Sequence, residues 1–255
     1  MNLLLDERLA AGYSSAAQKI RVMSEAWTRH HILCASCGSP IEGERNNSPV
    51  LDFRCLVCRE QYELKSKQNA FSRKVTDGAY KTMLARVLAS NNPNFFFLAY
   101  EPRQLEVINF FVVPGHFFEP GIIEKRKPLA STARRAGWVG CNILLDQIPE
   151  SGRIHYIRNK IMVPKKHVQS AWHKTAFLKK SHSPESRGWV LEVMRCIEKI
   201  GLEEFSLNDV YRFEAELKKK YPSNNFIKDK IRQQLQMLRD KGYLEFKGAG
   251  KYRVI

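Results

Sequence analysis

The sequence predicts a mixed α/β domain with a central sheet flanked by helices, followed by a smaller, mainly helical C-terminal domain. Three observations support this. Helical and strand-like patterns alternate through the first 180 residues, as in mixed α/β domains. The polar stretch Ser181–Ser186 contains a proline and has the composition of a linker. The residues beyond it are rich in helical patterns. We therefore expect two domains, residues 1–182 and 183–255.

The elements of the first domain follow from apolar periodicity and from residues that start or stop helices. Ser15–Gln18 has the form of a capping box, and Thr76 or Asp77 can cap a second helix. Residues 34–58 carry several glycines and prolines, so outside one short strand they are expected to be loop. The expected elements are, in order, a helix from Ser15 to about His30, strands at 50–54 and 61–66, a helix ending at 91–93, strands at 94–100 and 105–113, a strand near 152–157 and a helix near 168–180.

Residues 183–255 have the pattern of a winged helix-turn-helix domain. Three amphipathic helices are expected, the second capped by Ser206 and the third opened by Ser223 or Asn224, followed by two strands joined at 248–250. Polar side chains lie away from the apolar stripe of the third helix and can bind base edges and phosphates. They are Asn225, Lys228, Arg232, Gln233 and Gln236, with Arg232 and Gln236 the favoured pair. An ordinary helical bundle whose polar face meets water is the alternative.

The charge of the chain is concentrated in one segment. The net charge is +16, and residues 121–182 contain 13 basic and 3 acidic side chains, a net charge of +10. A solvated surface normally mixes both signs, so this segment favours contact with nucleic-acid phosphates. A basic protein without a polyanionic partner is the alternative.

Composition excludes several other classes of protein. A hydrophobic fraction of 44% is enough for a packed core and argues against wholesale disorder. No run of about 18 apolar residues occurs, which argues against a membrane span. The N-terminal segment lacks the basic head and long apolar centre of a signal peptide. We therefore expect a cytoplasmic protein with reduced cysteines, no membrane contact and no organic cofactor.

Four of the six cysteines form two CxxC pairs with the spacing of a zinc ribbon. The pairs are separated by seventeen residues and comprise Cys34, Cys37, Cys55 and Cys58. Four thiolates complete a tetrahedral site and leave no open position for water, so the predicted Zn²⁺ is structural. An iron–sulfur cluster and unligated thiols are the alternatives. Cys196 lies beside a helical apolar stripe and is expected in the core.

Two acids and a lysine flank the second CxxC pair. Asp52 precedes it, and Glu63 and Lys65 alternate along the next strand, so their side chains share one face. If the two strands form a hairpin, Asp52 meets this face. Two carboxylates can hold a divalent cation such as Mg²⁺, and the ammonium can stabilise charge on a phosphate. This combination suits phosphodiester hydrolysis. By itself the spacing is also compatible with a plain surface hairpin.

Asp52 with Glu63-x-Lys65 resembles the PD-(D/E)xK nuclease signature, with Leu51 where proline is usual. The wider sequence resembles the DpnI family of restriction endonucleases, to which the Dam-replacing proteins are related. The resembling segments span nearly the whole chain and are the zinc-braced hairpin and residues 77–87, 91–98, 126–143, 186–200 and 231–253.

The resemblance implies a PD-(D/E)xK nuclease domain with a zinc knuckle, followed by a winged-helix domain. It further implies a type II, methyl-directed restriction enzyme that cuts double-stranded DNA at GATC when the adenine carries an N6-methyl group. The implied catalytic set is Asp52, Glu63 and Lys65, with Asp52 and Glu63 as Mg²⁺ ligands. Neither composition nor spacing reveals the target sequence or its methylation.

The basic segment contains a candidate reader of the modified base. Residues 131–141 hold Arg134, Arg135 and Trp138, together with two glycines and no acids. Arginines contact phosphates or guanine edges, and an indole can pack on a methyl group. We hypothesise that Trp138 contacts the N6-methyl group. A buried core tryptophan is the alternative.

A function of another class also fits much of the sequence, namely a non-catalytic regulator with a zinc ribbon and a winged helix. Such a protein has no need to assemble the acids and lysine of the hairpin, and that feature favours the nuclease.

Overall fold

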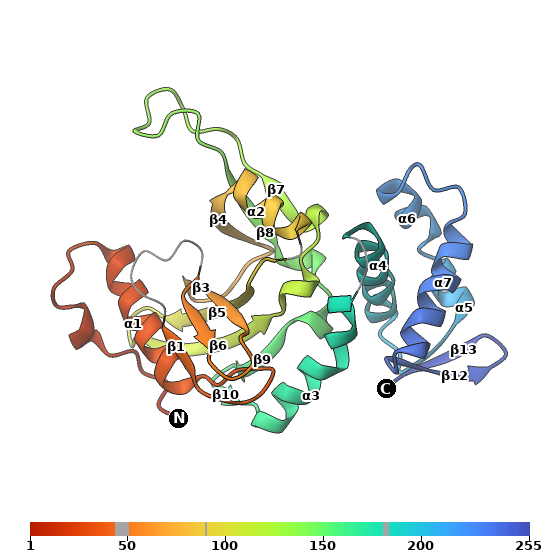
Figure 1. Ribbon diagram of the computed structural model, residues 1–255, viewed down its shortest axis with the longest axis horizontal. Coiled ribbons are helices and arrows are strands. Elements are labelled where there is room, and N and C mark those ends of the chain that lie inside the picture. The colour runs from red at the N-terminus through yellow and green to blue at the C-terminus, as the bar shows by residue number, and fades with distance from the viewer. Residues whose placement is uncertain (44–50, 90, 181–183) are drawn as a thin grey trace.

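A computed structural model describes residues 1–43, 51–89, 91–180 and 184–255 (Figure 1). Its main sheet has seven strands in the order β1-β2-β3-β5-β6-β9-β10. β3 and β5 pair in parallel, and the other pairs of this sheet are antiparallel. The strands are β1 (Ile41–Gly43), β2 (Phe53–Cys55), β3 (Gln61–Gln68), β5 (Asn94–Glu101), β6 (Glu106–Val113), β9 (Ile154–Arg158) and β10 (Ile161–Met162).

Apolar residues cover both faces of the sheet, which explains the continuous hydrophobic run in β5. Phe96 and Leu98 pack into one cluster with Trp27 of α1 (Ala16–His31) and Trp172 of α3 (Lys165–Thr175). Phe95 and Phe97 pack into a second cluster, with α2 (Tyr80–Leu88) and the C-terminal domain. The mixed α/β fold with a central sheet is confirmed.

Several predicted elements are confirmed with shifted boundaries, and three predicted helix caps are wrong, among them Ser223 or Asn224, since Phe226 stands at the N-cap of the helix Ile227–Asp240. The helix α1 forms, but Ser15 makes no side-chain cap bond. The helix α2 begins after Ala79, and Asp77 lies in β4 (Lys74–Ala79) instead of capping it. The reason is that β4 pairs with β8, which holds these residues in an extended conformation. The predicted helix at 168–180 divides into α3 and a 3₁₀ helix at 176–180.

A second sheet of three short strands was not predicted. Its order is β4-β8-β7, with β8 at Gly140–Leu144 and β7 at Ile123–Lys125. Residues 126–139 join β7 to β8 and project from the body of the protein (Figure 1). We call this segment the arm. Its base is closed by a hydrogen bond from the Leu129 amide to the Trp138 carbonyl, 2.9 Å long.

The C-terminal domain is a winged helix-turn-helix, as predicted. Its sheet has the order β11-β13-β12. Ser206 and Asp209 form a capping box at the start of the second helix, which is interrupted after Tyr211 and so forms two short helices. The elements are α4 (Pro184–Ile200), β11 (Glu204–Ser206), α5 (Leu207–Tyr211), α6 (Glu214–Lys220), α7 (Ile227–Asp240), β12 (Leu244–Gly248) and β13 (Lys251–Val254).

The helix α4 joins the two parts of the molecule. Trp189 and Val193, both buried, belong to the same apolar cluster as Phe95 and Phe118. Of the predicted linker 181–186, residues 181–183 lie outside the described residues and 184–186 already belong to α4. No helix in the described parts of the chain is long and apolar enough to span a membrane.

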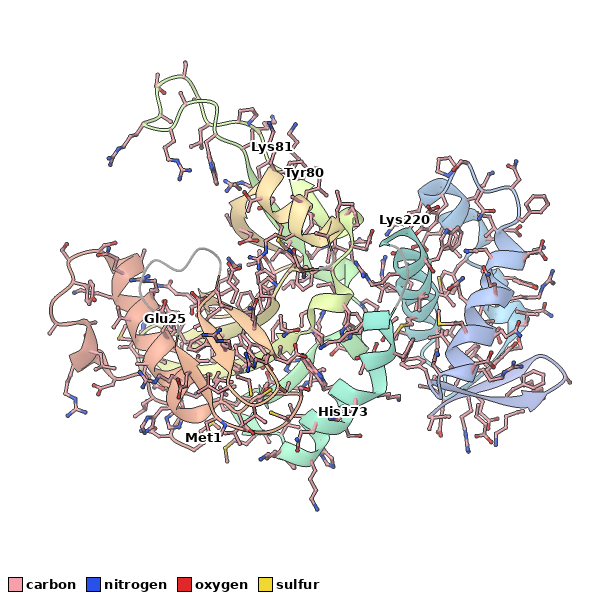
Figure 2. The ribbon with its side chains drawn as sticks, in the orientation of Figure 1. Met1, Glu25, Tyr80, Lys81, His173 and Lys220 are labelled. Atoms are coloured by element: carbon pink, nitrogen blue, oxygen red, sulfur yellow. The ribbon has the colours of Figure 1, made fainter. Side chains whose placement is uncertain are left out.

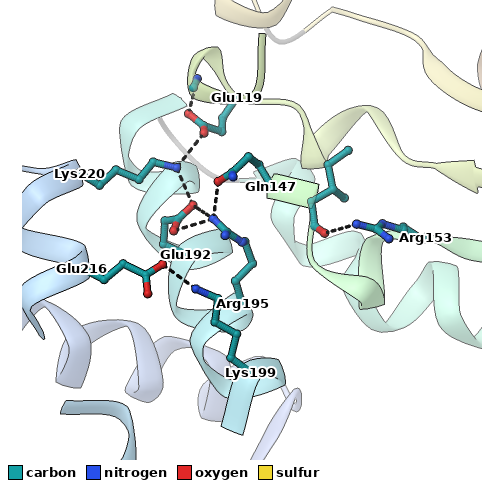
Figure 3. Close-up of polar contacts among 10 residues, drawn as sticks. Glu119, Gln147, Arg153, Glu192, Arg195, Lys199, Glu216 and Lys220 are labelled. Carbon is teal, nitrogen blue, oxygen red and sulfur yellow. Dashed lines mark hydrogen bonds and ion pairs between the residues drawn. The ribbon is translucent and has the colours of Figure 1, made fainter. Parts of the chain in front are cut away.

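Polar contacts reinforce this junction (Figure 3). The Lys220 ammonium of α6 lies 2.6 Å from Glu192 on α4 and 3.5 Å from Glu119. Arg195 donates to Glu192 at 2.9 Å and to the Gln147 side chain at 2.7 Å. Glu192 is thus bound by Lys220 and Arg195, which lie on two helices of the C-terminal domain. The same two cations also contact Glu119 and Gln147 of the first domain.

Candidate active site and metal centre

The predicted hairpin forms and fixes Asp52 beside β3. β2 and β3 are antiparallel, with Phe53 opposite Tyr62. The Asp52 amide donates to the Tyr62 carbonyl at 3.0 Å, and the Asp52 carboxylate accepts a 2.6 Å hydrogen bond from the Leu64 amide. The carboxylate is therefore held against the backbone between Glu63 and Lys65.

Glu63 and Lys65 share one face of β3, as the strand alternation predicts. The Lys65 ammonium lies 2.5 Å from Glu63 Oε1 and also contacts Asp77 Oδ1. The second oxygen, Glu63 Oε2, is buried and has no hydrogen-bond partner within the described residues. A buried carboxylate oxygen without a partner is costly unless something binds it.

The electrostatics of this cluster favour an added cation. The pKa of Glu63 is raised to about 7, mainly by burial and also by the charges of Asp77 and Asp52, while the Lys65 charge opposes the shift. Burial also raises the pKa of Asp52, although the hydrogen bond from the Leu64 amide and the charge of Lys65 act to lower it. For Lys65, burial lowers the pKa, but the carboxylates of Glu63 and Asp77 outweigh burial and raise it above its ordinary value. One ammonium therefore serves several buried acids.

Two further acids belong to this region and were missed as site residues. Asp77 reaches Lys65 from β4, and its side chain is 6% exposed. Glu25 lies on α1 (Figure 2), where burial raises its pKa and the Asp52 charge adds to the shift. The sequence pattern predicts Thr76 or Asp77 as a helix cap, and Glu25 lies in no motif. Only the pairing of β4 with β8, and the packing of α1 on the sheet, reveal them.

The oxygen-rich set fits a magnesium ion. Mg²⁺ prefers carboxylate oxygens and waters, and Asp52 and the unpartnered Glu63 Oε2 supply such oxygens. The structure thus brings together the three residues predicted as the catalytic set. It places the predicted DNA-contacting residues elsewhere, on the arm and on α7.

The four predicted zinc ligands gather in one cluster. The sulfur atoms of Cys34, Cys37, Cys55 and Cys58 all lie within 4.8 Å of one another. The Cys34–Cys58 and Cys37–Cys55 sulfur pairs are each 3.4 Å apart. Tetrahedral zinc with Zn–S bonds of about 2.3 Å requires sulfurs separated by roughly 3.8 Å. The thiol cluster therefore fits a zinc ion.

Both CxxC pairs use the same backbone turn. The Gly38 amide donates to the Cys34 carbonyl at 2.8 Å, and the Arg59 amide donates to the Cys55 carbonyl at 3.0 Å. Both donors adopt positive φ, +72° for Gly38 and +66° for Arg59. This turn directs the two sulfurs of each pair toward the same point.

Tyr62 connects the thiol cluster to β3. Its hydroxyl lies 3.0 Å from the Cys34 sulfur, and its ring stacks on Phe96 with centroids 4.3 Å apart. Because Tyr62 and Glu63 are neighbours in β3, the cluster braces the strand on the face opposite Glu63. The thiol cluster therefore supports the strand that carries Glu63 and provides no ligand to the carboxylate site.

On the arm, the arginines are exposed and the tryptophan is half-buried. Arg134 and Arg135 are both open to solvent, and the Arg135 guanidinium lies 4.8 Å from the centre of the Trp138 ring. The indole packs on Gly140, where an added Cβ would come within 2.8 Å of it. Trp138 is therefore a residue of the arm base, not of the hydrophobic core.

The polar residues predicted on the third helix are all exposed. They are Asn225, Lys228, Arg232, Gln233 and Gln236, at or on α7. Arg232 donates to the Tyr211 hydroxyl at 2.9 Å, and the Lys228 ammonium lies 5.4 Å from the Tyr211 ring. This face is free of buried side chains and suited to a groove of DNA. Nearby Phe226 is 71% exposed.

Two family models match the chain. A model described as DpnI, the Dam-replacing family, matches residues 1–181. A second model, described as the Dam-replacing HTH domain, matches residues 185–254. Between them they cover both the part with the carboxylates and thiols and the part with the exposed helix α7.

Proposed function

Since the chain belongs to the Dam-replacing DpnI family and ends in a helix-turn-helix DNA-binding domain, we propose that it is a type II, methyl-directed restriction endonuclease. It cleaves double-stranded DNA at GATC sites that contain N6-methyladenine, by Mg²⁺-dependent hydrolysis of a phosphodiester. Residues 1–182 form the nuclease domain, and residues 183–255 form a separate reader.

The observation that carries this proposal is the buried cluster on β3. The Leu64 amide, next to Glu63 in the chain, fixes the Asp52 carboxylate, and one Glu63 oxygen has no partner among the described residues. Lys65 lies against the same carboxylate. A protein that only binds DNA gains nothing from burying this charged set, because desolvation of each group costs free energy.

The roles of the residues follow from their chemistry. Asp52 and Glu63 hold Mg²⁺, which when bound polarises the phosphate and acidifies a water molecule. Lys65 presents a buried ammonium that offsets the charge developing on the phosphate. The backbone amide of Leu64 orients Asp52 and so sets the direction of its oxygens.

Two surfaces supply contact with DNA. The arm carries Arg126, Lys127, Arg134 and Arg135 and no acid, so it suits the phosphate backbone. Trp138 at its base offers an apolar surface for a methyl group. Exposed residues of α7, led by Arg232 and Gln236, suit base edges in the major groove.

The test compares plasmid DNA prepared in adenine-methylating and non-methylating hosts, with Mg²⁺. The wild-type protein should cut only the methylated plasmid, and Asp52→Asn should reduce cutting at least about 100-fold. Asp146→Asn, a surface carboxylate paired with Arg73, is the matched control and should cut normally. Binding of both plasmids without cutting would contradict the proposal and favour a DNA-binding regulator.

A further inference from the structure

Asp77 lies between the catalytic strand and the sheet that bears the arm. It belongs to β4, which pairs with β8 and not with the main sheet. Its carboxylate nevertheless contacts the Lys65 ammonium on β3, a strand of the main sheet. We propose that Asp77 is a positioning residue for cleavage, which holds the Lys65 ammonium in place and ties it to the sheet that carries the arm. This inference rests on the proposed nuclease function.

The contact is buried and specific. The side chain of Asp77 is 6% exposed and that of Lys65 is 18% exposed. At such burial a charged pair persists only if its geometry is well defined. Lys65 has Glu63 on one side and Asp77 on the other, so it is held between two carboxylates on different sheets. If the Glu63 carboxylate binds a metal ion and interacts less with Lys65, the Asp77 carboxylate still holds the Lys65 ammonium in place.

A backbone irregularity directs Asp77 toward Lys65. In the β4–β8 pair Asp77 lies opposite Cys141 and Ala79 lies opposite Gly140, so the register shifts at Gly78. Bulges of this kind re-aim side chains and occur beside active sites. The Cys141 thiol lies 3.5 Å from the Gly78 carbonyl, which places β8 directly behind the shift.

The same stretch of β8 is the base of the arm. The Tyr80 amide, three residues after Asp77, donates to the Val139 carbonyl at 3.1 Å, and Val139 is the last residue of the arm. The Lys125 ammonium, at the other end of the arm, lies 5.8 Å from the centre of the Tyr80 ring. Figure 2 shows Tyr80 and Lys81 directly beneath the arm. A short run of paired backbone therefore connects the base of the arm to the residue that contacts Lys65.

The geometry favours positioning over metal binding for Asp77. The charged group that the Asp77 carboxylate contacts is the Lys65 ammonium. Asp77 thus acts on the reaction through Lys65.

The experiment measures single-turnover cleavage, DNA affinity and Mg²⁺ dependence for Asp77→Asn. We expect a cleavage rate about 10 to 100-fold below wild type, since small displacements of a catalytic group have effects of that size. The dissociation constant for methylated duplex and the Mg²⁺ concentration at half-maximal rate should each stay within about twofold of wild type, because phosphate contacts and metal ligands are unchanged.

The matched control is Glu124→Gln. Glu124 lies on β7 of the same sheet, and its carboxylate binds Lys74 and Asn142. This variant should cleave at the wild-type rate. Asp77→Glu keeps the charge and should recover part of the rate lost in Asp77→Asn. Asp77→Glu as slow as Asp77→Asn at equal thermal stability would show a packing role and overturn the proposal.

Other outcomes also decide the matter. A wild-type rate for Asp77→Asn would refute the role of Asp77 and leave the nuclease function standing. A markedly higher Mg²⁺ requirement would make Asp77 a metal ligand and refute the positioning role. A wild-type protein that cuts no methylated DNA would refute the proposed function itself.

Discussion

At the scale of single residues, the candidate site is defined by buried charges that share too few partners. Glu63 keeps one oxygen unpartnered within the described residues, and Lys65 divides its ammonium between two acids. Such an arrangement stabilises the fold poorly but is suited to receive a cation and a phosphate. The free-energy cost of burying these charges therefore falls on the residues proposed to bind the metal ion and the phosphate.

Trp138→Ala tests the reader of the modified base. The indole is half-buried on the arm and packs on Gly140, outside the main core. We expect preference for methylated over unmethylated duplex to fall by about 10-fold, the equivalent of roughly 1.4 kcal/mol of lost contact, with little loss of thermal stability. Competition binding with the two duplexes and a thermal melt measure both. An unchanged preference would exclude Trp138 as the methyl contact.

His116 predicts a pH dependence of stability. The pKa of His116 is lowered to about 3, mainly by burial and in addition by the charges of Lys179 and Arg187. In the unfolded chain a histidine titrates near 6.5, so between these values the unfolded state binds one more proton. Stability should therefore fall with decreasing pH below about 6.5, by up to about 1.4 kcal/mol per pH unit from this residue.

The check on His116 is urea unfolding of wild type and His116→Gln at about pH 5 and about pH 7. The variant lacks the titrating ring, so its free energy of unfolding should change less between the two pH values. Parallel pH dependence in the two proteins would show that His116 is not the group responsible.

Residue-scale prediction from sequence succeeded where chemistry repeats at short spacing. The two CxxC pairs and the Glu63-x-Lys65 alternation predict which side chains lie together, because backbone geometry fixes neighbours. Asp77 was not predicted as a site residue because its proposed role depends on a contact between two sheets. A polar residue just before a helix has the same local pattern whether it caps the helix or ends a strand.

At the scale of elements, the hairpin of β2 and β3 carries both the carboxylates and two of the cysteines. Its predicted pairing is observed, with strands shifted by a few residues. The β4-β8-β7 sheet was missed because its strands have three to six residues and little apolar alternation. Short strands of this kind are specified by their partners more than by their own sequence.

Removal of one thiol tests the zinc element. Cys37 is half-exposed, so Cys37→Ser should disturb packing little yet lose zinc, because three thiolates bind it more weakly than four. We expect a thermal midpoint lower by more than about 5 °C. Cys196→Ala, a buried core cysteine outside the cluster, should keep its zinc. Elemental analysis gives the metal content, and retention of zinc by Cys37→Ser would contradict the assignment.

The two metals should separate on chelation. Mg²⁺ usually keeps several waters and is held by only one or two carboxylates, whereas the thiols predicted to bind zinc include the buried Cys34 and Cys55. Brief EDTA treatment should stop cleavage while the zinc content and the melting curve remain unchanged. Immediate unfolding of the protein by mild chelation would contradict the division into a catalytic and a structural ion.

At the scale of the whole molecule, α4 makes one body of two functional parts. Its buried residues extend the apolar cluster of the first domain into the second, and the contacts of Glu192 and Arg195 add polar links (Figure 3). The sequence indicated a division near residue 182 but not this shared core, since a helical stripe does not identify what it packs against.

The distribution of charge predicts different roles for the arm and α7 in binding. Arg134→Ala with Arg135→Ala should weaken binding to all duplexes and reduce the slope of log affinity against log salt by roughly 2, if each arginine contacts one phosphate. Arg232→Ala should reduce discrimination between sequences by about 1–3 kcal/mol. Arg8→Ala, an exposed arginine paired with Asp6, is the control. An unchanged slope for the arm variant would exclude it from the phosphate contacts.

The parallel pairing of β3 with β5 has a consequence for how new specificities can arise. Parallel neighbours need a long connection, and here it contains β4 and α2, with the β7–β8 hairpin and its arm added against β4. The arm thus lies outside the strands that hold the carboxylates. We expect that exchange of the arm between relatives would alter the proposed contact with DNA while β3 keeps its sequence. The fold therefore separates the arm, which evolution or protein engineering can exchange, from β3, which keeps Glu63 and Lys65.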